Sequence, residues 1–297
     1  MTALVIFAFS AALLYGGADF LGGVAARRAT PLAVIALTMP AGAVILLAIL
    51  AAGRGVPGLG GLTAVGGGWA SAGWAIGGGA VGAAGLIAFY RGFATASMSV
   101  VAPVSALVST VLPVAIALAG GERPGITVIA GAPLCLAAIV LVSAERTDSA
   151  APRARLRGVA YGVTAGAAFG LFFVFLKYAG QNGGHDTALW LVTVQRLTGS
   201  VLALVMLAIT RTQPPWRGGA DRGLLRIALI SGAADAAANV CYVMATQTGQ
   251  FGLAVVITSL YPGMTVLLAR LVLRERMRLV QRIGLLLAAA GVVLVTM

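Results

Sequence analysis

The chain has 297 residues, of which 60% are hydrophobic and only 9% are charged. A soluble domain carries roughly 25% charged residues, so this composition excludes an ordinary water-soluble protein and predicts that lipid surrounds the chain. The net charge is +12, but the basic residues stand in short segments between apolar runs. That distribution is typical of membrane topology signals and excludes a nucleic-acid partner.

Ten apolar runs are long enough to cross a bilayer, whose core of about 30 Å requires about 20 helical residues. They cover residues 2–24, 32–52, 72–94, 98–119, 125–143, 157–178, 188–210, 223–246, 251–273 and 280–297. The links between them are too short to hold a soluble domain. The predicted fold class is an all-α membrane protein with ten transmembrane helices.

The basic residues are divided unequally between the two ends of these runs. One end receives only Arg54, Arg123 and Lys177, Arg196 lies within a run, and the remaining arginines fall at the other end. Lys and Arg accumulate in cytoplasmic loops. We therefore expect the charged loops to be cytoplasmic, both termini to be periplasmic, and the protein to lie in a bacterial inner membrane.

The two halves of the chain resemble each other at an offset of about 153 residues. Gly121-Glu122-Arg123 matches Arg274-Glu275-Arg276, and residues 139–142 match residues 292–295. Five spans per copy is an odd number, so the second copy must enter the membrane upside down. This predicts two inverted five-helix repeats, 1–143 and 157–297, joined by a cytoplasmic linker, 144–156. Inverted repeats are typical of secondary transporters, which work by alternating access at the repeat interface.

Ten spans in two halves, with Glu122-Arg123 and Glu275-Arg276 after the fourth helix of each half, resemble the drug/metabolite transporter (DMT) superfamily. The most similar branch is the EamA-type exporters, among them the aromatic amino-acid exporters. The resemblance implies a cavity lined mainly by the first, third and fourth spans and by their counterparts, the sixth, eighth and ninth. The expected function is export of small metabolites, with amino acids as substrates. The alternative is efflux of cationic amphiphilic drugs or toxic compounds by proton antiport.

Other classes of function fit less well. The sequence has no P-loop, no Cys/His cluster for a metal, and loop acids that are scattered rather than gathered as a membrane enzyme would need. We therefore expect no enzyme activity, no cofactor and no metal. The expected partners are a small-molecule substrate, the lipid bilayer and, for the antiport alternative, protons. The chain could act as a monomer or a homodimer.

Polar residues inside spans are costly and therefore candidates for function. In the eighth span, a stripe at helical spacing occupies one face. Its members are Ser231, Asp235, Asn239, Tyr242 and Thr246. The stripe could line the transport path, or it could hold helices together as polar groups often do in membranes.

Two ion pairs are predicted within the spans. Asp235 and Arg196 lie at similar depths in adjacent spans, and Arg91 is the expected partner of Asp19. A carboxyl group buried without a partner could instead exchange a proton. Proton antiport and facilitated diffusion therefore both stay open.

The predicted substrate-binding residues combine polar groups with aromatic rings, which suit a small amphiphile and can hold a cationic amine. They are Tyr15, Asp19, Tyr90, Ser105, Phe169, Phe173, Asp235, Asn239, Tyr242 and Ser259. Proline within a span removes a backbone hydrogen bond and can kink the helix. Pro103, Pro113 and Pro262 are therefore the predicted gating residues.

Overall fold

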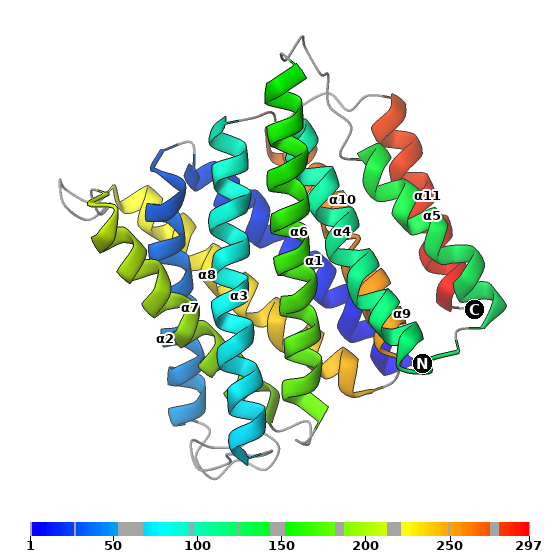
Figure 1. Cartoon of the computed structure of the whole chain (residues 1–297), viewed down its shortest axis with the longest axis horizontal. Helices are drawn as coiled ribbons and strands as arrows, with labels where there is room; N and C mark the ends of the chain where they lie inside the picture. Colours follow the sequence, from blue (N-terminus) through cyan, green and yellow to red (C-terminus); the bar gives the residue numbers. More distant parts are fainter. Residues whose placement is uncertain are drawn as a thin grey trace.

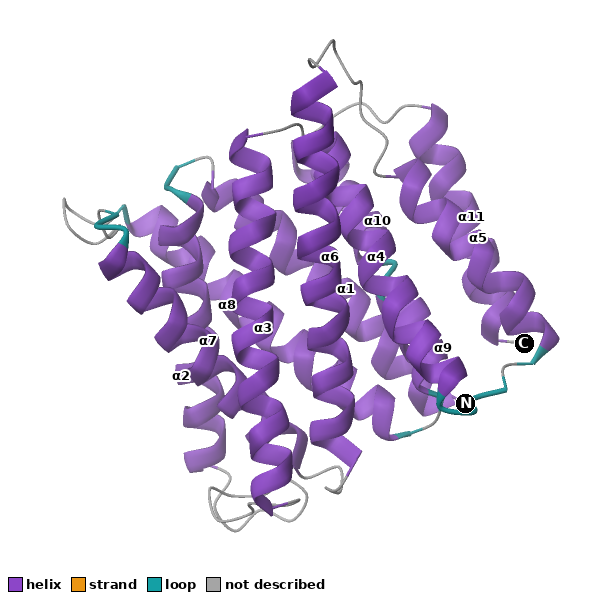
Figure 2. Ribbon diagram, in the orientation of Figure 1, coloured by secondary structure: helices purple, strands orange, loops and turns teal. Residues whose placement is uncertain are grey.

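A computed structural model describes residues 2–26, 28–52, 68–95, 98–123, 125–142, 152–181, 187–212, 221–248, 250–273 and 279–296. Within these ranges the regular structure is helical and no strand occurs (Figure 2). The helices are α1 (Thr2–Ala26), α2 (Pro31–Ala52), α3 (Gly68–Thr95), α4 (Met98–Ala119), α5 (Ile126–Val142), α6 (Pro152–Gln181), α7 (Ala188–Ile209), α8 (Arg222–Gln247), α9 (Phe251–Thr258), α10 (Tyr261–Leu273) and α11 (Leu279–Thr296). The predicted all-α class is confirmed for these residues.

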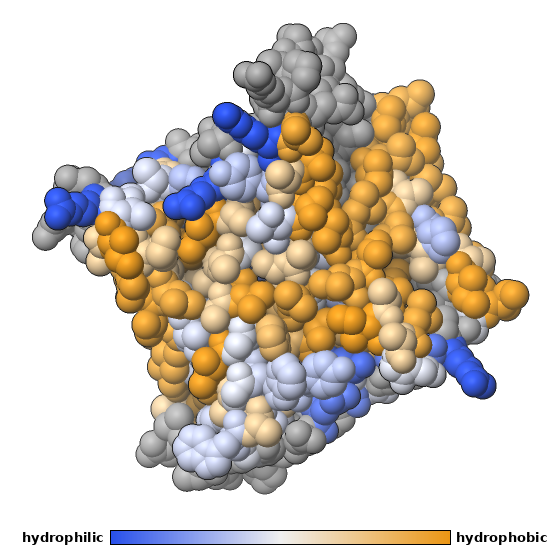
Figure 3. Space-filling model, in the orientation of Figure 1, coloured by the Kyte–Doolittle hydropathy of each residue, from blue (hydrophilic) through white to orange (hydrophobic). Residues whose placement is uncertain are grey.

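Helices are the expected solution for so apolar a chain, because a helix satisfies its own backbone hydrogen bonds in lipid. In the described part of the chain, α1, α2, α3, α6, α7 and α8 are long and apolar enough to cross a membrane, and shorter apolar helices accompany them. Hydrophobic side chains cover much of the middle of the face in Figure 3, with hydrophilic ones towards its ends. The chain is a multi-pass membrane protein.

The predicted span 251–273 is interrupted. α9 ends at Thr258 and α10 begins at Tyr261. At the break, the Leu260 amide bonds to the Ile257 carbonyl in a tightened turn. Pro262 lacks the amide hydrogen that a continuous helix would donate to Thr258, and the residue before a proline disfavours helical geometry. These two effects explain why one predicted helix is observed as two.

The helices form one bundle with both chain termini at the same end (Figure 1). We call this the termini end, and the opposite end, which carries Arg28, Arg91, Arg157 and Arg211, the arginine end. α3 and α4 pack on α6, while α1 packs on α8, α9 and α10. α3 also contacts α7, α2 contacts both α7 and α8, and α5 pairs with α11 at one edge.

The contact between α3 and α6 is a ladder of glycines facing aromatic rings. A Cβ added at Gly82 would lie 2.8 Å from the Phe172 ring, and one at Gly85 would lie 2.9 Å from the Phe169 ring. The next contacts along the pair join Gly78 to Phe175 and Gly92 to Tyr161. Small residues allow two membrane helices to approach closely. The ladder therefore fixes both the spacing of these helices and the rotation of α3 about its axis.

Candidate functional site

The polar stripe on α8 faces neighbouring helices. Ser231 donates a hydrogen bond to the Ala18 carbonyl of α1 over 2.9 Å. Tyr242 donates to the Phe173 carbonyl of α6 over 3.3 Å. Both side chains are buried. These contacts support the packing interpretation for Ser231 and Tyr242. Asp235 and Asn239, which lie between them on the stripe, make different contacts.

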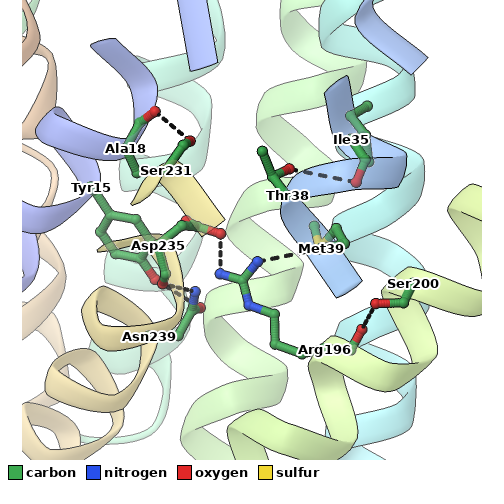
Figure 4. Close-up of polar contacts among 10 residues, drawn as sticks. All are labelled: Tyr15, Ala18, Ile35, Thr38, Met39, Arg196, Ser200, Ser231, Asp235 and Asn239. Atoms are coloured by element: carbon green, nitrogen blue, oxygen red, sulfur yellow. Dashed lines mark hydrogen bonds and ion pairs between the residues drawn. The ribbon is translucent and has the colours of Figure 1, made fainter. Parts of the chain in front are cut away.

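At that centre, Asp235 forms an ion pair with Arg196 of α7 (Figure 4). The Arg196 side chain is only 1% exposed, whereas that of Asp235 is 29% exposed. The Arg196 Nη1 atom also lies 3.3 Å from the sulfur of Met39 on α2. The pair therefore joins three helices, with its cation enclosed and its carboxylate partly open.

Asn239 extends the network to α1. The Tyr15 hydroxyl donates to Asn239 Oδ1 over 2.8 Å, and Asn239 Nδ2 donates to the Asp235 carbonyl over 2.7 Å (Figure 4). Tyr15 and Asn239 are both buried. Asn239 thus links the hydroxyl of Tyr15 to Asp235, the acidic member of the ion pair.

Tyr15 also belongs to a cluster of four rings contributed by α1, α6, α8 and α10. Its ring centroid lies 6.2 Å from that of Phe173 and 6.1 Å from that of Tyr261, both in edge-to-face arrangements. Phe173 lies 4.7 Å from Tyr242. We call these four residues the aromatic layer. It fills the middle of the bundle below Asp19, on the side of the termini end.

Asp19 lies one helical turn from Tyr15 towards the arginine end and is exposed. On α1 nearer the termini end, Ala8, Ala11 and Ala12 are buried, whereas Ile6 and Phe9 on the opposite face are exposed. Among the contacts of the described residues, the Asp19 carboxylate has no hydrogen bond or ion pair. The expected pair with Arg91 is absent there, because Arg91 stands on the outer side of α3, where it lines a groove between α6 and α7.

Other predicted site residues lie at helix contacts. Phe169 packs between α6 and α3, with its ring 5.7 Å from Phe89. Ser105 is buried where α4 meets α6, and buried Ser259 donates to the Val256 carbonyl of its own helix. Pro113 is buried in α4. The side chains of Tyr90, Pro103 and Pro262 lie outside the described residues.

Sequence reasoning missed a second polar cluster, at the termini end. The carboxylate of Glu122, just after α4, accepts the backbone N–H groups of Phe251 (3.2 Å) and Gly252 (3.0 Å), the first residues of α9. Lys177 of α6 places its Nζ atom 3.9 Å from Glu122 Oε1 and 4.3 Å from the centroid of the Phe251 ring. We call Glu122, Lys177 and Phe251 the termini-end cluster. The available signal was Lys177 itself, a cation close to an apolar span.

The termini-end cluster closes the bundle beneath the aromatic layer. A carboxylate at a helix N-terminus satisfies free amide groups and complements the helix dipole. α9 behind it is buried, from Phe251 through Val255 to Thr258. The bundle is therefore packed at the termini end, whereas Asp19, nearer the arginine end, is exposed.

The comparisons with known proteins agree with a transporter architecture. Residues 156–297 match the EamA-like transporter family. The match covers the second half of the chain, and the family is one of membrane transporters. A solved crystal structure with 19% sequence identity matches 100% of this chain and 97% of its own length with a TM-score of 0.76, which shows a shared fold. No curated protein matches the chain.

Proposed function

We propose that the chain is a secondary transporter that exports amino acids or related small metabolites by alternating access. The observation that carries this proposal is the position of Asp19, an exposed carboxylate inside a bundle that is closed on its other side by the aromatic layer. A site open to one side and sealed from the other is what one half of an alternating-access cycle requires.

The proposal includes ten membrane crossings in two inverted repeats, 1–143 and 157–297, with α9 and α10 together forming the ninth. The helix contacts support it, because exchanging the two halves maps the main helix pairings onto one another. The pairing of α3 with α6 becomes that of α8 with α1, and the contact of α3 with α7 becomes that of α8 with α2. The pairs α2–α7 and α5–α11 map onto themselves.

The site chemistry suits a molecule with an amino and a carboxylate group. Asp19 would attract the ammonium group, and the aromatic faces of Tyr15 and Tyr261 can hold a cation. Arg196, whose partner Asp235 is partly exposed, is the buried cation towards which a substrate carboxylate would turn. The aromatic layer adds apolar surface for a side chain, which agrees with the aromatic amino-acid exporters as the relevant branch.

The arginines support an orientation with the arginine end in the cytoplasm of a bacterial cell, because positive residues are retained on that side. The cavity at Asp19 would then face the cytoplasm, from which an exporter takes its substrate. Export would finish when the termini-end cluster opens.

A second candidate is efflux of cationic amphiphiles by proton antiport. It is favoured by one observation, the carboxyl group of Asp19, which has no cationic partner among the described residues. A cation and a proton could occupy that carboxylate alternately, which would couple their movements.

Flux in proteoliposomes distinguishes the candidates. Labelled aromatic amino acids and a lipophilic quaternary ammonium compound would be tested with and without a pH gradient. We expect amino-acid flux in the parent, a loss of at least ten-fold in Asp19→Asn and Asp235→Asn, and parental flux in Asp148→Asn, which removes one acid from the linker. Full flux in both span variants would overturn the proposed roles, and transport of the quaternary compound alone would favour the second candidate.

A further inference from the structure

The outer face of α3 forms a groove that the transport site does not use. Its cavity has a volume of about 420 Å³, and its lining includes Ala80, Ala84 and Ala88 of α3, Tyr161 of α6 and Met206 of α7. α3 turns Gly82 and Gly85 towards α6 and Gly79 towards α7. Ala84 and Arg91 lie on the remaining side of this helix and are exposed. The groove therefore opens to the surroundings of the bundle and not to its interior.

The groove has the length of one leaflet of a bilayer. Its ends on α3, Ala80 and Arg91, are eleven positions apart, which at 1.5 Å per residue is about 16 Å. The hydrocarbon core is about 30 Å thick, so this is about half of it. Because α3 ends at Thr95, the groove occupies the half of the membrane nearer the arginine end. Apart from Arg91, Tyr161 and Thr164, the lining consists of alanine, isoleucine, leucine and methionine side chains, which suit an acyl chain.

Positive charge gathers where the groove reaches the membrane surface. Arg91 is itself part of the lining. Arg157 lies one turn from the lining residue Tyr161 on α6, and Arg211 lies two residues after the end of α7, five residues beyond Met206. All three side chains are exposed. Three helices that border one apolar groove thus each bring an arginine to the level of the lipid headgroups.

We propose that this groove binds one anionic phospholipid of the leaflet at the arginine end. An acyl chain lies along the alanine face of α3, and the phosphate is held by Arg157 and Arg211 together with Arg91. Basic pockets between transmembrane helices bind anionic headgroups, and guanidinium groups match phosphate oxygens in geometry and charge. A zwitterionic lipid has the same acyl chains but a headgroup without net charge, so the arginines should select the anionic lipid. This inference does not depend on the transported substrate.

Native mass spectrometry of the full chain in detergent tests the proposal without measuring transport. The protein would be incubated with equal amounts of phosphatidylglycerol and phosphatidylcholine of the same chain length. We expect one phosphatidylglycerol to be retained in preference to phosphatidylcholine by the parent. The double variant Arg157→Gln/Arg211→Gln should reduce that retention at least five-fold, because it removes two of the three positive charges.

A second variant separates the groove from general surface charge. Ala84→Phe fills the groove and leaves every charge in place, so it should also reduce retention at least five-fold. The matched controls are Arg123→Gln, an exposed arginine near the termini end, and Ala115→Phe, an exposed alanine on α4. Both controls should retain lipid as the parent does. All of the variants should have the same thermal stability as the parent. Equal retention of the two lipids, or an unchanged lipid preference in Ala84→Phe, would overturn the proposal.

Discussion

Arg196 of α7 and Asp235 of α8 form an ion pair whose two members differ in exposure, with the guanidinium enclosed and the carboxylate partly exposed. Breaking a buried pair leaves an uncompensated charge, which typically costs about 3–5 kcal/mol. The cost should depend on which member remains. Asp235 can be hydrated through its open side, whereas Arg196 cannot.

We therefore expect Asp235→Asn to lower the thermal stability of the purified protein more than Arg196→Gln does. The measurement is the unfolding temperature in detergent for each variant. Replacement of both residues by Arg196→Met/Asp235→Leu should recover part of the loss, since it leaves no buried charge. Equal unfolding temperatures for the two single variants would contradict the asymmetry.

Tyr15→Phe should destabilise the protein through one hydrogen bond. It removes the donor to Asn239 Oδ1 and leaves a buried acceptor, which costs about 1–3 kcal/mol, while the ring contacts of the aromatic layer persist. Thermal unfolding measures this loss. Tyr178→Phe is the control, because the described contacts of Tyr178 are those of its ring, and we expect no comparable change there.

Gly232→Ala should prevent α2 and α8 from approaching. A Cβ at this position would lie 2.3 Å from the Thr38 carbonyl oxygen, which is backbone and cannot turn aside. We expect the variant to lose most of its folded yield after solubilisation. At Gly17, an added Cβ meets nothing within 4 Å, so Gly17→Ala should be recovered like the parent. Good recovery of Gly232→Ala would show that the helices are spaced differently.

Loosening the termini-end cluster should expose α9. Lys177→Met removes the cation beside Glu122, and Glu122→Gln removes the charge that faces the α9 amide groups. In a background without native cysteines, the buried reporter Val255→Cys should react with a polar maleimide several-fold faster in either variant. Arg123→Gln, next to Glu122 in the chain, should leave the rate unchanged. A reporter equally slow in all variants would argue that this end is not held by the cluster.

Pro262→Ala should join α9 to α10 by restoring the amide hydrogen that can bond to the Thr258 carbonyl. If the break is a gate, flux in proteoliposomes should fall several-fold. Pro40→Ala is the control, since α2 runs through Pro40 without interruption and its flux should be parental. Normal flux in Pro262→Ala would remove the proline from the gating mechanism.

Much of the fold could be predicted because lipid imposes simple rules. Span length and hydrophobicity indicate helices directly, and helical spacing brings Ser231, Asp235 and Asn239 to one face of α8. Counting residues from the membrane surface also brings Arg196 to the depth of Asp235, because both helices rise by the same amount per residue. The break at Ser259 and Leu260 was not predicted, since those residues are compatible with a helix and the effect comes from the following proline.

The rest of the site depended on how each helix is rotated about its axis and on which helices lie next to each other. A single sequence does not give either. Arg91 was assigned to Asp19 by depth alone, but the glycines of α3 turn Arg91 to the outside of the bundle. In the same way, the sequence showed Glu122 only as part of a repeated motif and as a loop acid. Its role required knowing that the end of α4 meets the beginning of α9, a contact between residues far apart in the chain.

The glycine–aromatic ladder between α3 and α6 has a consequence for how the protein can move. Each ring sits in a notch left by a missing side chain, so sliding one helix along the other would lift several rings out of their notches at once. α3 and α6 must then travel together, although they come from opposite halves of the chain. In the proposed transport cycle, the rigid bodies would therefore cut across the two halves.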